Sequence, residues 1–235
     1  MPGSSWNGHL VPRDATVAEL QAMLERDAPD CWVAFKALGQ SRDPAAFKLL
    51  ALETESPDEF RRRAALEALA ESPLRLEARE QVRRLLNDPS PFVVRTALLA
   101  AAAFPEAELH DIVLQFLAHA DPRTRETAVS ALGYLWRGDD FEVVLNRMTE
   151  DVDADVRKEA AWVLAHRARS HSRTLIDRWR SSPLPRERVW ACELIAESEG
   201  RQYRTILESL VRDSDGHVRD AARRTLATFD NQDAR

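Results

Sequence analysis

Glycine, cysteine and long apolar runs are all scarce in this 235-residue sequence, and each shortage excludes a class of protein. Seven glycines and few β-branched runs disfavour a sheet-rich fold and favour helices. Cys31 and Cys192 stand far apart, so neither a disulfide framework nor a zinc site is expected. The longest apolar run, 97–104, is far shorter than the roughly 20 residues that a membrane-spanning helix needs.

Motifs for catalysis and cofactor binding are also missing. No histidine is followed by glutamate, and the chain has neither a glycine-rich phosphate loop nor a G-x-S-x-G motif. Residues 150–156, EDVDADV, resemble a calcium loop, but Val156 and Trp162 stand where that loop needs Gly and Glu. We therefore expect a protein that is not an enzyme and that holds no metal ion and no cofactor.

The charge distribution and the N-terminal segment indicate which partners and which compartment to expect. The net charge of −6 disfavours nonspecific binding to nucleic acid. From Arg157 onwards, however, 16 Lys and Arg face 12 Asp and Glu, so the basic C-terminal part keeps nucleic acid as a less favoured partner. Residues 1–13 carry no secretory signal pattern, and we expect them to form a flexible leader on a cytoplasmic monomer that contacts no membrane.

One pattern recurs along the chain every 31 or 32 residues. An anchor position, often arginine, is followed after three residues by alanine and after four more by an aliphatic residue. The anchors are Cys31, Arg62, Val94, Arg125, Arg157, Arg188 and Arg219. The alanines are Ala34, Ala65, Ala97, Ala128, Ala160, Ala191 and Ala222. This spacing predicts a helix with one buried stripe in each of seven units.

A second periodic series precedes each anchor and predicts a first helix in every unit. Its members recur every 31 residues: Leu20, Ala51, Val82, Val113, Val144, Leu175 and Ile206. The residue four positions later is apolar in six units, and Glu55 is the exception. Each unit therefore consists of a first helix, a short turn and an alanine-rich second helix. Units of this length that are made of helix pairs indicate a solenoid, because one pair cannot bury its apolar face alone.

The frame D-x-x-x-R-x-x-A-x-x-x-L resembles the short HEAT-like repeats of the type found in phycobilisome lyases. The resemblance implies an all-α fold, a right-handed α-solenoid (superhelix) of about seven HEAT-like helix pairs of ~31 residues. It covers residues 14–229 as a single repeat domain, and we expect residues 230–235 to form a disordered tail. Because this fold serves many unrelated functions, the resemblance does not by itself identify an activity.

Four units carry an aspartate four residues before the anchor arginine, which places both groups on one helix face. We interpret these residues as a structural ladder that bridges successive repeats, rather than as a ligand site. The ladder comprises Asp58, Arg62, Asp121, Arg125, Asp153, Arg157, Asp215 and Arg219.

Side chains that do not repeat identify a candidate binding surface. The stripe one, five and nine residues after the anchor lies off the buried stripe of the second helix, and in such solenoids the second helices usually line the concave face. Aromatic and cationic residues on a groove are typical of binding hot spots. The candidates are Arg95, Tyr134, Lys158, Trp162, His166, Trp190 and Glu193. Trp162 and Trp190 are open to two interpretations, as surface residues or as core between repeats, whereas Trp179 is expected in the core.

The favoured function is a noncatalytic protein-binding module, either an adaptor or an inhibitor such as a toxin-neutralising immunity protein. A nucleic-acid enzyme is the first alternative, because the HEAT-like alkylpurine DNA glycosylases use Trp, Arg and a carboxylate in their groove. Arg95, Trp162, Trp190 and Glu193 could imitate that set. A phycobilin lyase or chaperone is the second alternative, suggested by the repeat type alone.

Overall fold

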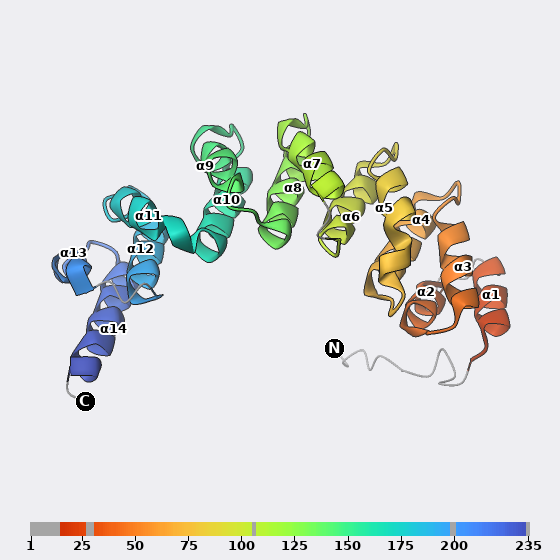
Figure 1. Cartoon of the computed structure of the whole chain (residues 1–235), viewed down its shortest axis with the longest axis horizontal. Coiled ribbons are helices and arrows are strands. Elements are labelled where there is room, and N and C mark those ends of the chain that lie inside the picture. Colours follow the sequence, from red (N-terminus) through yellow and green to blue (C-terminus); the bar gives the residue numbers. More distant parts are fainter. Residues whose placement is uncertain (1–14, 27–30, 105–106, 198–200, 234–235) are drawn as a thin grey trace, which may run out of the picture. The chain divides into compact units, whose positions relative to one another are not determined.

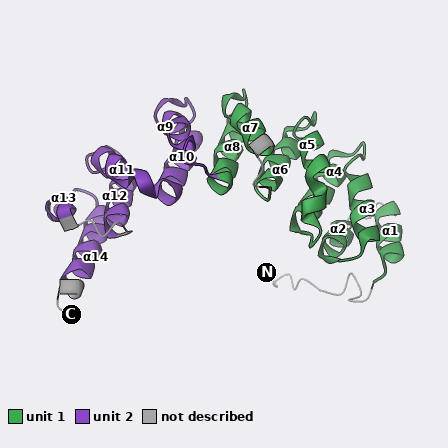
Figure 2. Cartoon of the chain, in the orientation of Figure 1, with its two compact units in different colours: residues 1–135 green, residues 136–235 purple. Residues whose placement is uncertain are grey.

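The computed structural model describes residues 15–26, 31–104, 107–197 and 201–233. These residues contain fourteen α-helices and no β-strand (Figure 1). The chain divides into two compact units, residues 1–135 and 136–235 (Figure 2). The boundary falls after a complete helix pair, so each unit is a stack of whole pairs. The prediction of an all-α solenoid of seven helix pairs is confirmed.

The first unit has four helix pairs. Its helices are α1 (Val17–Glu25), α2 (Cys31–Gln40), α3 (Pro44–Glu53), α4 (Glu59–Glu71), α5 (Arg79–Leu85), α6 (Pro91–Ala101), α7 (Ala107–Gln115) and α8 (Pro122–Leu135). Two short 3-10 helices, Arg75–Ala78 and Phe116–Ala118, lie between them. Each even-numbered helix packs against the next even-numbered one, which produces a continuous layer of second helices in this unit.

The second unit has three helix pairs. Its helices are α9 (Asp140–Glu150), α10 (Ala154–Arg167), α11 (Ser172–Trp179), α12 (Pro185–Glu197), α13 (Arg204–Leu210) and α14 (Gly216–Asp233). The 3-10 helices Arg169–His171 and Arg201–Tyr203 precede α11 and α13. Helices α12 and α14 pack closely along their lengths, whereas α10 and α12 contact each other sparsely.

The repeated alanines explain the close packing of the second helices. All seven alanines that follow the anchors by three residues have no solvent-accessible surface. A methyl side chain lets neighbouring backbones approach, and any larger side chain at these positions would have to displace a helix. A comparable approach occurs at Gly39, where an added Cβ would lie 2.8 Å from the carbonyl oxygen of Ala68.

The periodic residues of the first helices are buried in five of the seven units. The two exceptions are Ala51 and Ile206, which are half-buried, because in α3 and α13 the neighbouring residues Leu50 and Leu207 occupy the core. The shift also explains why Glu55 breaks the apolar series: the buried side chain of that turn is Thr54, one position earlier. The 31-residue spacing therefore predicts the helices correctly and misses a one-residue shift in two of them.

The C-terminal end differs from our expectation. The sequence predicts a disordered tail over residues 230–235, but α14 continues through Asp233, and residues 234–235 lie outside the described residues. Phe229 is buried, and Arg204 donates a hydrogen bond from Nη2 to Oδ1 of Asp230 at 2.8 Å, so this last turn is attached to α13. The predicted leader, residues 1–13, lies outside the described residues. No helix among the described residues is long and apolar enough to cross a membrane.

Candidate functional site

The predicted binding residues fall in both units, so we describe each group within its own unit. Arg95 and Tyr134 belong to the first unit. Arg95 is engaged inside that unit: its Nη1 lies 3.5 Å from Oδ2 of Asp121, and its guanidinium lies over the ring of Phe92 at 4.8 Å. Tyr134 is 63% exposed near the end of α8.

Helix α10 presents the most accessible group of candidates. Lys158, Trp162 and His166 are spaced by four residues and are all exposed, so they share one solvent-facing stripe. The rings of Trp162 and His166 stack with their centroids 4.3 Å apart, and Nδ1 of His166 lies 2.7 Å from the carbonyl oxygen of Trp162. Trp162 remains 40% exposed, so it is a surface aromatic residue that the fold orients without burying.

Trp190 belongs to the core instead. It is only 9% exposed, and its ring packs against the fully buried Trp179 with centroids 5.6 Å apart. The expectation that Trp179 is a core residue is therefore confirmed. Trp190 is mostly buried and packs on Trp179 within its own helix pair. Position two after the anchor borders the buried stripe, and a ring as large as indole extends into the core from there. Glu193, three residues later on α12, is exposed.

The aspartates of the predicted ladder cap the second helices. Asp153 accepts hydrogen bonds from the backbone N–H groups of Asp155 and Val156 at the start of α10. Asp58, Asp121 and Asp215 accept equivalent bonds at the starts of α4, α8 and α14. A carboxylate at this position satisfies N–H groups that the helix leaves unpaired and is favoured by the helix dipole.

The anchor arginines tie each second helix to the turn that precedes it. Nη1 of Arg157 donates to the carbonyl oxygens of Asp151 at 2.7 Å and of Val152 at 3.1 Å. Arg62, Arg125 and Arg219 donate from Nη1 to the two carbonyls at the same offsets. Arg188 donates in the same way to the carbonyl oxygen of Ser182. This contact belongs to the scaffold, because it occurs in every pair that has an arginine at the anchor.

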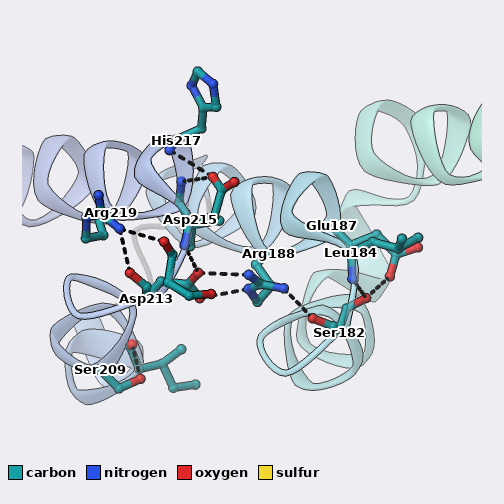
Figure 3. Close-up of polar contacts among 12 residues, drawn as sticks. Ser182, Leu184, Glu187, Arg188, Ser209, Asp213, Asp215, His217 and Arg219 are labelled. Carbon is teal, nitrogen blue, oxygen red and sulfur yellow. Dashed lines mark hydrogen bonds and ion pairs between the residues drawn. The ribbon is translucent and has the colours of Figure 1, made fainter.

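The anchor arginines Arg62 and Arg188 also reach the next repeat. Arg188 donates from Nε and Nη2 to the two carboxylate oxygens of Asp213, each at 2.8 Å (Figure 3). Arg62 forms the same two-pronged contact with Asp88, at 2.7 and 2.8 Å. The hydrogen bond from Arg188 holds the pKa of Asp213 below its ordinary value, against the opposing effect of burial. The carboxylate that bridges repeats is therefore in the following turn, and the sequence frame did not include it.

That turn residue performs one function in every pair from the second to the seventh. Its side chain accepts a hydrogen bond from the backbone N–H two residues later, at 2.8 to 3.2 Å. The residues are Ser56, Asp88, His119, Asp151, Ser182 and Asp213. Because serine, aspartate and histidine all offer an acceptor atom, the role is preserved while the residue type changes. Matching residue identities along the sequence could not detect this series.

A pocket of about 360 Å³ opens in the second unit where α10 and α12 contact each other sparsely. We call it the α10–α12 pocket. Its lining residues are Met148, Ala154, Arg157, Lys158, Ala161, Leu184, Pro185, Arg186, Glu187 and Trp190. Most of this surface is apolar, and Arg157, Lys158 and Arg186 form a cationic rim. Of the predicted binding residues, Lys158 and Trp190 line this pocket; Arg186 and Leu184 do so as well, and sequence reasoning did not select them.

Two observations bear on thiol and metal chemistry in the described part of the chain. Burial raises the pKa of the Cys192 thiol to about 12, which keeps it protonated and unreactive. No cluster of three or more His, Cys, Asp and Glu side chains among these residues could hold a metal ion.

Comparison with known proteins identifies the repeats. The family model for HEAT repeats matches residues 52–133 and, in an overlapping register, 80–165. Residues 52–165 are therefore HEAT repeats. This assignment confirms the resemblance that the repeated Asp, Arg, Ala and Leu frame indicates. None of the curated proteins matches the sequence.

Solved structures of similar fold support the assignment. The HEAT-repeat chain is similar to YibA of Escherichia coli, at 16% identity over 88% of this chain and 81% of that chain, with a TM-score of 0.61. It is similar to the CpcE–CpcF complex of phycocyanin lyase from Nostoc sp. PCC7120, at 18% identity over 98% and 99%, with a TM-score of 0.56. An archaeal HEAT-like repeat protein from Thermococcus onnurineus NA1 matches at 15% identity over 92% and 98%, with a TM-score of 0.55. At these identities the similarity concerns the fold.

Proposed function

We propose that this HEAT-repeat chain is a noncatalytic protein-binding module whose partner docks on the second unit, at the α10–α12 pocket and the stripe of α10 beside it. The observation that carries the proposal is the combination of an apolar pocket, a cationic rim and the exposed Trp162. Tryptophan and arginine are the residues most enriched at the energetic centres of protein interfaces. Trp162 is positioned by its stack on His166, so little conformational entropy is lost when a partner covers it.

The pocket chemistry suits binding better than catalysis. Its titratable side chains are two arginines, one lysine and Glu187, and Glu187 accepts a hydrogen bond from Ser182 at 2.6 Å. No pair of nucleophile and general base is present among the lining residues. His166 on the neighbouring stripe has its Nδ1 beside the Trp162 carbonyl. Cations around an apolar floor attract and orient an acidic partner without any reaction step.

The nucleic-acid enzyme has less support, because the four residues that could imitate a glycosylase site do not form one exposed set. Trp190 is packed on Trp179, and Arg95 is paired with Asp121 in the first unit. The overall charge of −6 also opposes binding to a polyanion. Similarity to a phycocyanin lyase structure concerns the fold, and no pocket feature favours that activity over protein binding.

Site-specific photocrosslinking tests the proposal. A photoreactive phenylalanine analogue replaces His166, which is exposed next to Trp162, and in a second protein it replaces Arg173, which is exposed on α11. After irradiation in the native lysate, we expect a discrete protein adduct from position 166 and not from position 173. Lys158→Glu should reduce that adduct several-fold, whereas Arg212→Glu, the same charge change at an exposed residue away from the pocket, should not.

Three results would argue against the proposed function. Equal adducts from positions 166 and 173 would mean that capture is nonspecific. No adduct from position 166 would mean that this stripe contacts no partner. Adducts that nuclease treatment removes would favour the nucleic-acid alternative.

A further inference from the structure

The guanidinium of an anchor arginine has two hydrogen-bonding edges, and Arg62 and Arg188 use both. Nη1 serves the carbonyl of the preceding turn, and the edge formed by Nε and Nη2 holds a carboxylate of the next repeat. Arg188 shows the full arrangement, with Ser182 on one edge and Asp213 on the other (Figure 3). A planar guanidinium matches a carboxylate through two parallel bonds, so this edge has a defined chemical preference.

Arg157 uses only one of its edges. Its Nη1 is occupied by the carbonyl oxygens of Asp151 and Val152, but its Nε and Nη2 have no acceptor among the described residues. No carboxylate of the described chain lies within ion-pairing distance of this guanidinium. Arg157 is half-buried and is one of the residues that line the α10–α12 pocket.

The cause is a change of one residue type in the following turn. Ser182 stands where Asp88 and Asp213 stand in the repeats that follow Arg62 and Arg188. Its Oγ accepts the N–H of Leu184 at 3.1 Å, as Oδ1 of Asp213 accepts the N–H of Asp215 at 2.9 Å. Serine therefore keeps the turn but supplies no carboxylate to the arginine behind it. Its hydroxyl is directed to Glu187 instead.

We propose that the Nε and Nη2 edge of Arg157 binds a carboxylate from an acidic peptide segment of the partner, in the place that Asp88 fills for Arg62 and Asp213 fills for Arg188. A neighbouring apolar side chain of that segment enters the pocket against Leu184 and Trp190. This inference rests on the proposed function and names the chemistry of the partner. The chain itself shows which ligand an anchor arginine takes, at Asp88 and again at Asp213.

The charges around the pocket agree with this occupant. Lys158 and Arg186 join Arg157 on the rim, and Glu187 is the one carboxylate among the lining residues. The Arg186 guanidinium lies 5.8 Å from the ring centroid of Trp190, so one of these cations is held over the apolar floor. An acidic residue next to an apolar residue would complement both parts of the site. A basic segment would be repelled.

Selection from random dodecapeptides displayed on phage, with the full chain as bait, identifies the ligand chemistry. We expect enriched peptides to carry Asp or Glu within about three residues of a large apolar residue. A synthetic version of the most enriched peptide should bind at least about tenfold more tightly than its counterpart with each Glu and Asp changed to Gln and Asn. Enrichment of basic or uncharged peptides, or equal affinity of the amide counterpart, would overturn the inference.

An internal carboxylate offers a sharper test. In the double variant Ser182→Asp, Glu187→Gln, the new aspartate should occupy the free edge of Arg157, as Asp213 occupies that of Arg188. We expect it to weaken binding of the selected peptide at least about tenfold relative to Glu187→Gln alone, and to raise the melting temperature by about 2–4 °C. Ser56→Asp is the matched control, because the anchor behind Ser56 is Cys31 and not arginine. It should change neither the affinity nor the melting temperature.

A second variant keeps the test decisive if the double variant folds poorly. Arg157→Lys retains the positive charge but removes the two parallel donors, so it should weaken peptide binding by about tenfold. Lys158→Gln removes a charge on the same rim and should weaken binding less. Unchanged binding in Arg157→Lys would overturn the inference. Failure of the proposed function looks different: no peptide is enriched and no crosslink forms at position 166. Failure of this inference alone leaves peptide binding intact but independent of carboxylates.

Discussion

The second unit has two neighbouring interfaces between second helices, α12 with α14 and α10 with α12. Both have an arginine at the anchor position, but they differ in ion pairing and in packing. In the first, Arg188 joins its own turn to Asp213 of the next, and the two helices pack closely. In the second, Arg157 holds only its own turn, the helices contact each other sparsely, and a pocket of about 360 Å³ remains. The first interface contains an internal ion pair, and the second contains a pocket where we propose that a partner docks.

Under the proposal above, a scaffold residue becomes a binding residue. Arg157 and Arg188 occupy equivalent positions, and both donate from Nη1 to the turn before their helix. What differs is the residue in the following turn, Ser182 or Asp213. A repeat protein can therefore offer a site without adding a new functional side chain, if one repeat lacks the internal partner of a contact that other repeats make.

The largest expected difference between the interfaces concerns the two arginines. Arg188→Ala removes three hydrogen bonds and leaves the carboxylate of Asp213 largely buried without its charged partner, so it should lower the free energy of unfolding by about 3 kcal/mol. Arg157→Ala removes hydrogen bonds to two carbonyl oxygens and leaves no buried charge, so it should cost about 1 kcal/mol. Urea unfolding followed by helical ellipticity measures both. Equal losses would mean that the bridge to Asp213 contributes little.

The next largest expected effect is a pH dependence of the free energy of unfolding that arises at the α12–α14 interface. The pKa of Asp213 is lowered from 3.8, chiefly by the hydrogen bond from Arg188, so its contribution is present above pH 3.8 and is lost as the pH falls through the lowered value. Asp213→Asn should therefore be less stable than wild type at pH 7, by about 2 kcal/mol, and the difference should shrink below pH 3.8. Urea unfolding at a series of pH values from 7 to 3 measures this gap.

A double-mutant cycle assigns that pH dependence. In the Arg188→Ala background, Asp213→Asn should have a smaller effect at pH 7 and little additional change in acid. A gap that stays constant with pH in the wild-type background would show that Asp213 does not titrate as part of this pair.

The sequence predicts the scaffold well because the scaffold depends on repeated identities. Seven alanines at one offset become seven fully buried contacts, and the helix pairs follow from the spacing of apolar residues. The frame also shows where Asp58, Asp121, Asp153 and Asp215 begin the second helices. Its misses are one-residue shifts, such as Leu50 in place of Ala51, because an ideal period does not contain the local turn geometry.

The candidate site could be predicted only in part. Lys158 and Trp162 stand out as side chains that do not repeat, and both are exposed. The free edge of Arg157 becomes apparent only by comparison with Arg188, whose carboxylate partner Asp213 lies 25 positions further along the chain. The equivalent turn residue varies among serine, aspartate and histidine, so residue identities do not reveal the comparison. Trp190 was ambiguous for a different reason, because a position at the edge of the buried stripe can place a large ring on either side.

The smallest predicted effect restores a missing cap at the open interface. Leu184 occupies the position that Asp58, Asp121, Asp153 and Asp215 hold in other repeats, and it is 57% exposed before Pro185, much as Asp121 stands before Pro122. Leu184→Asp should cap α12 and raise the free energy of unfolding by about 0.5–1 kcal/mol, measured by urea unfolding.

The same change should weaken the selected peptide, because it replaces an apolar wall of the pocket with a negative charge. Leu76→Asp, an exposed leucine in the first unit, should gain no such stability and leave peptide binding unchanged. A Leu184→Asp variant that is more stable and still binds the peptide fully would mean that the peptide does not bind in the pocket. A variant that gains stability as it loses affinity would mean that this repeat departs from the frame because the leucine serves binding.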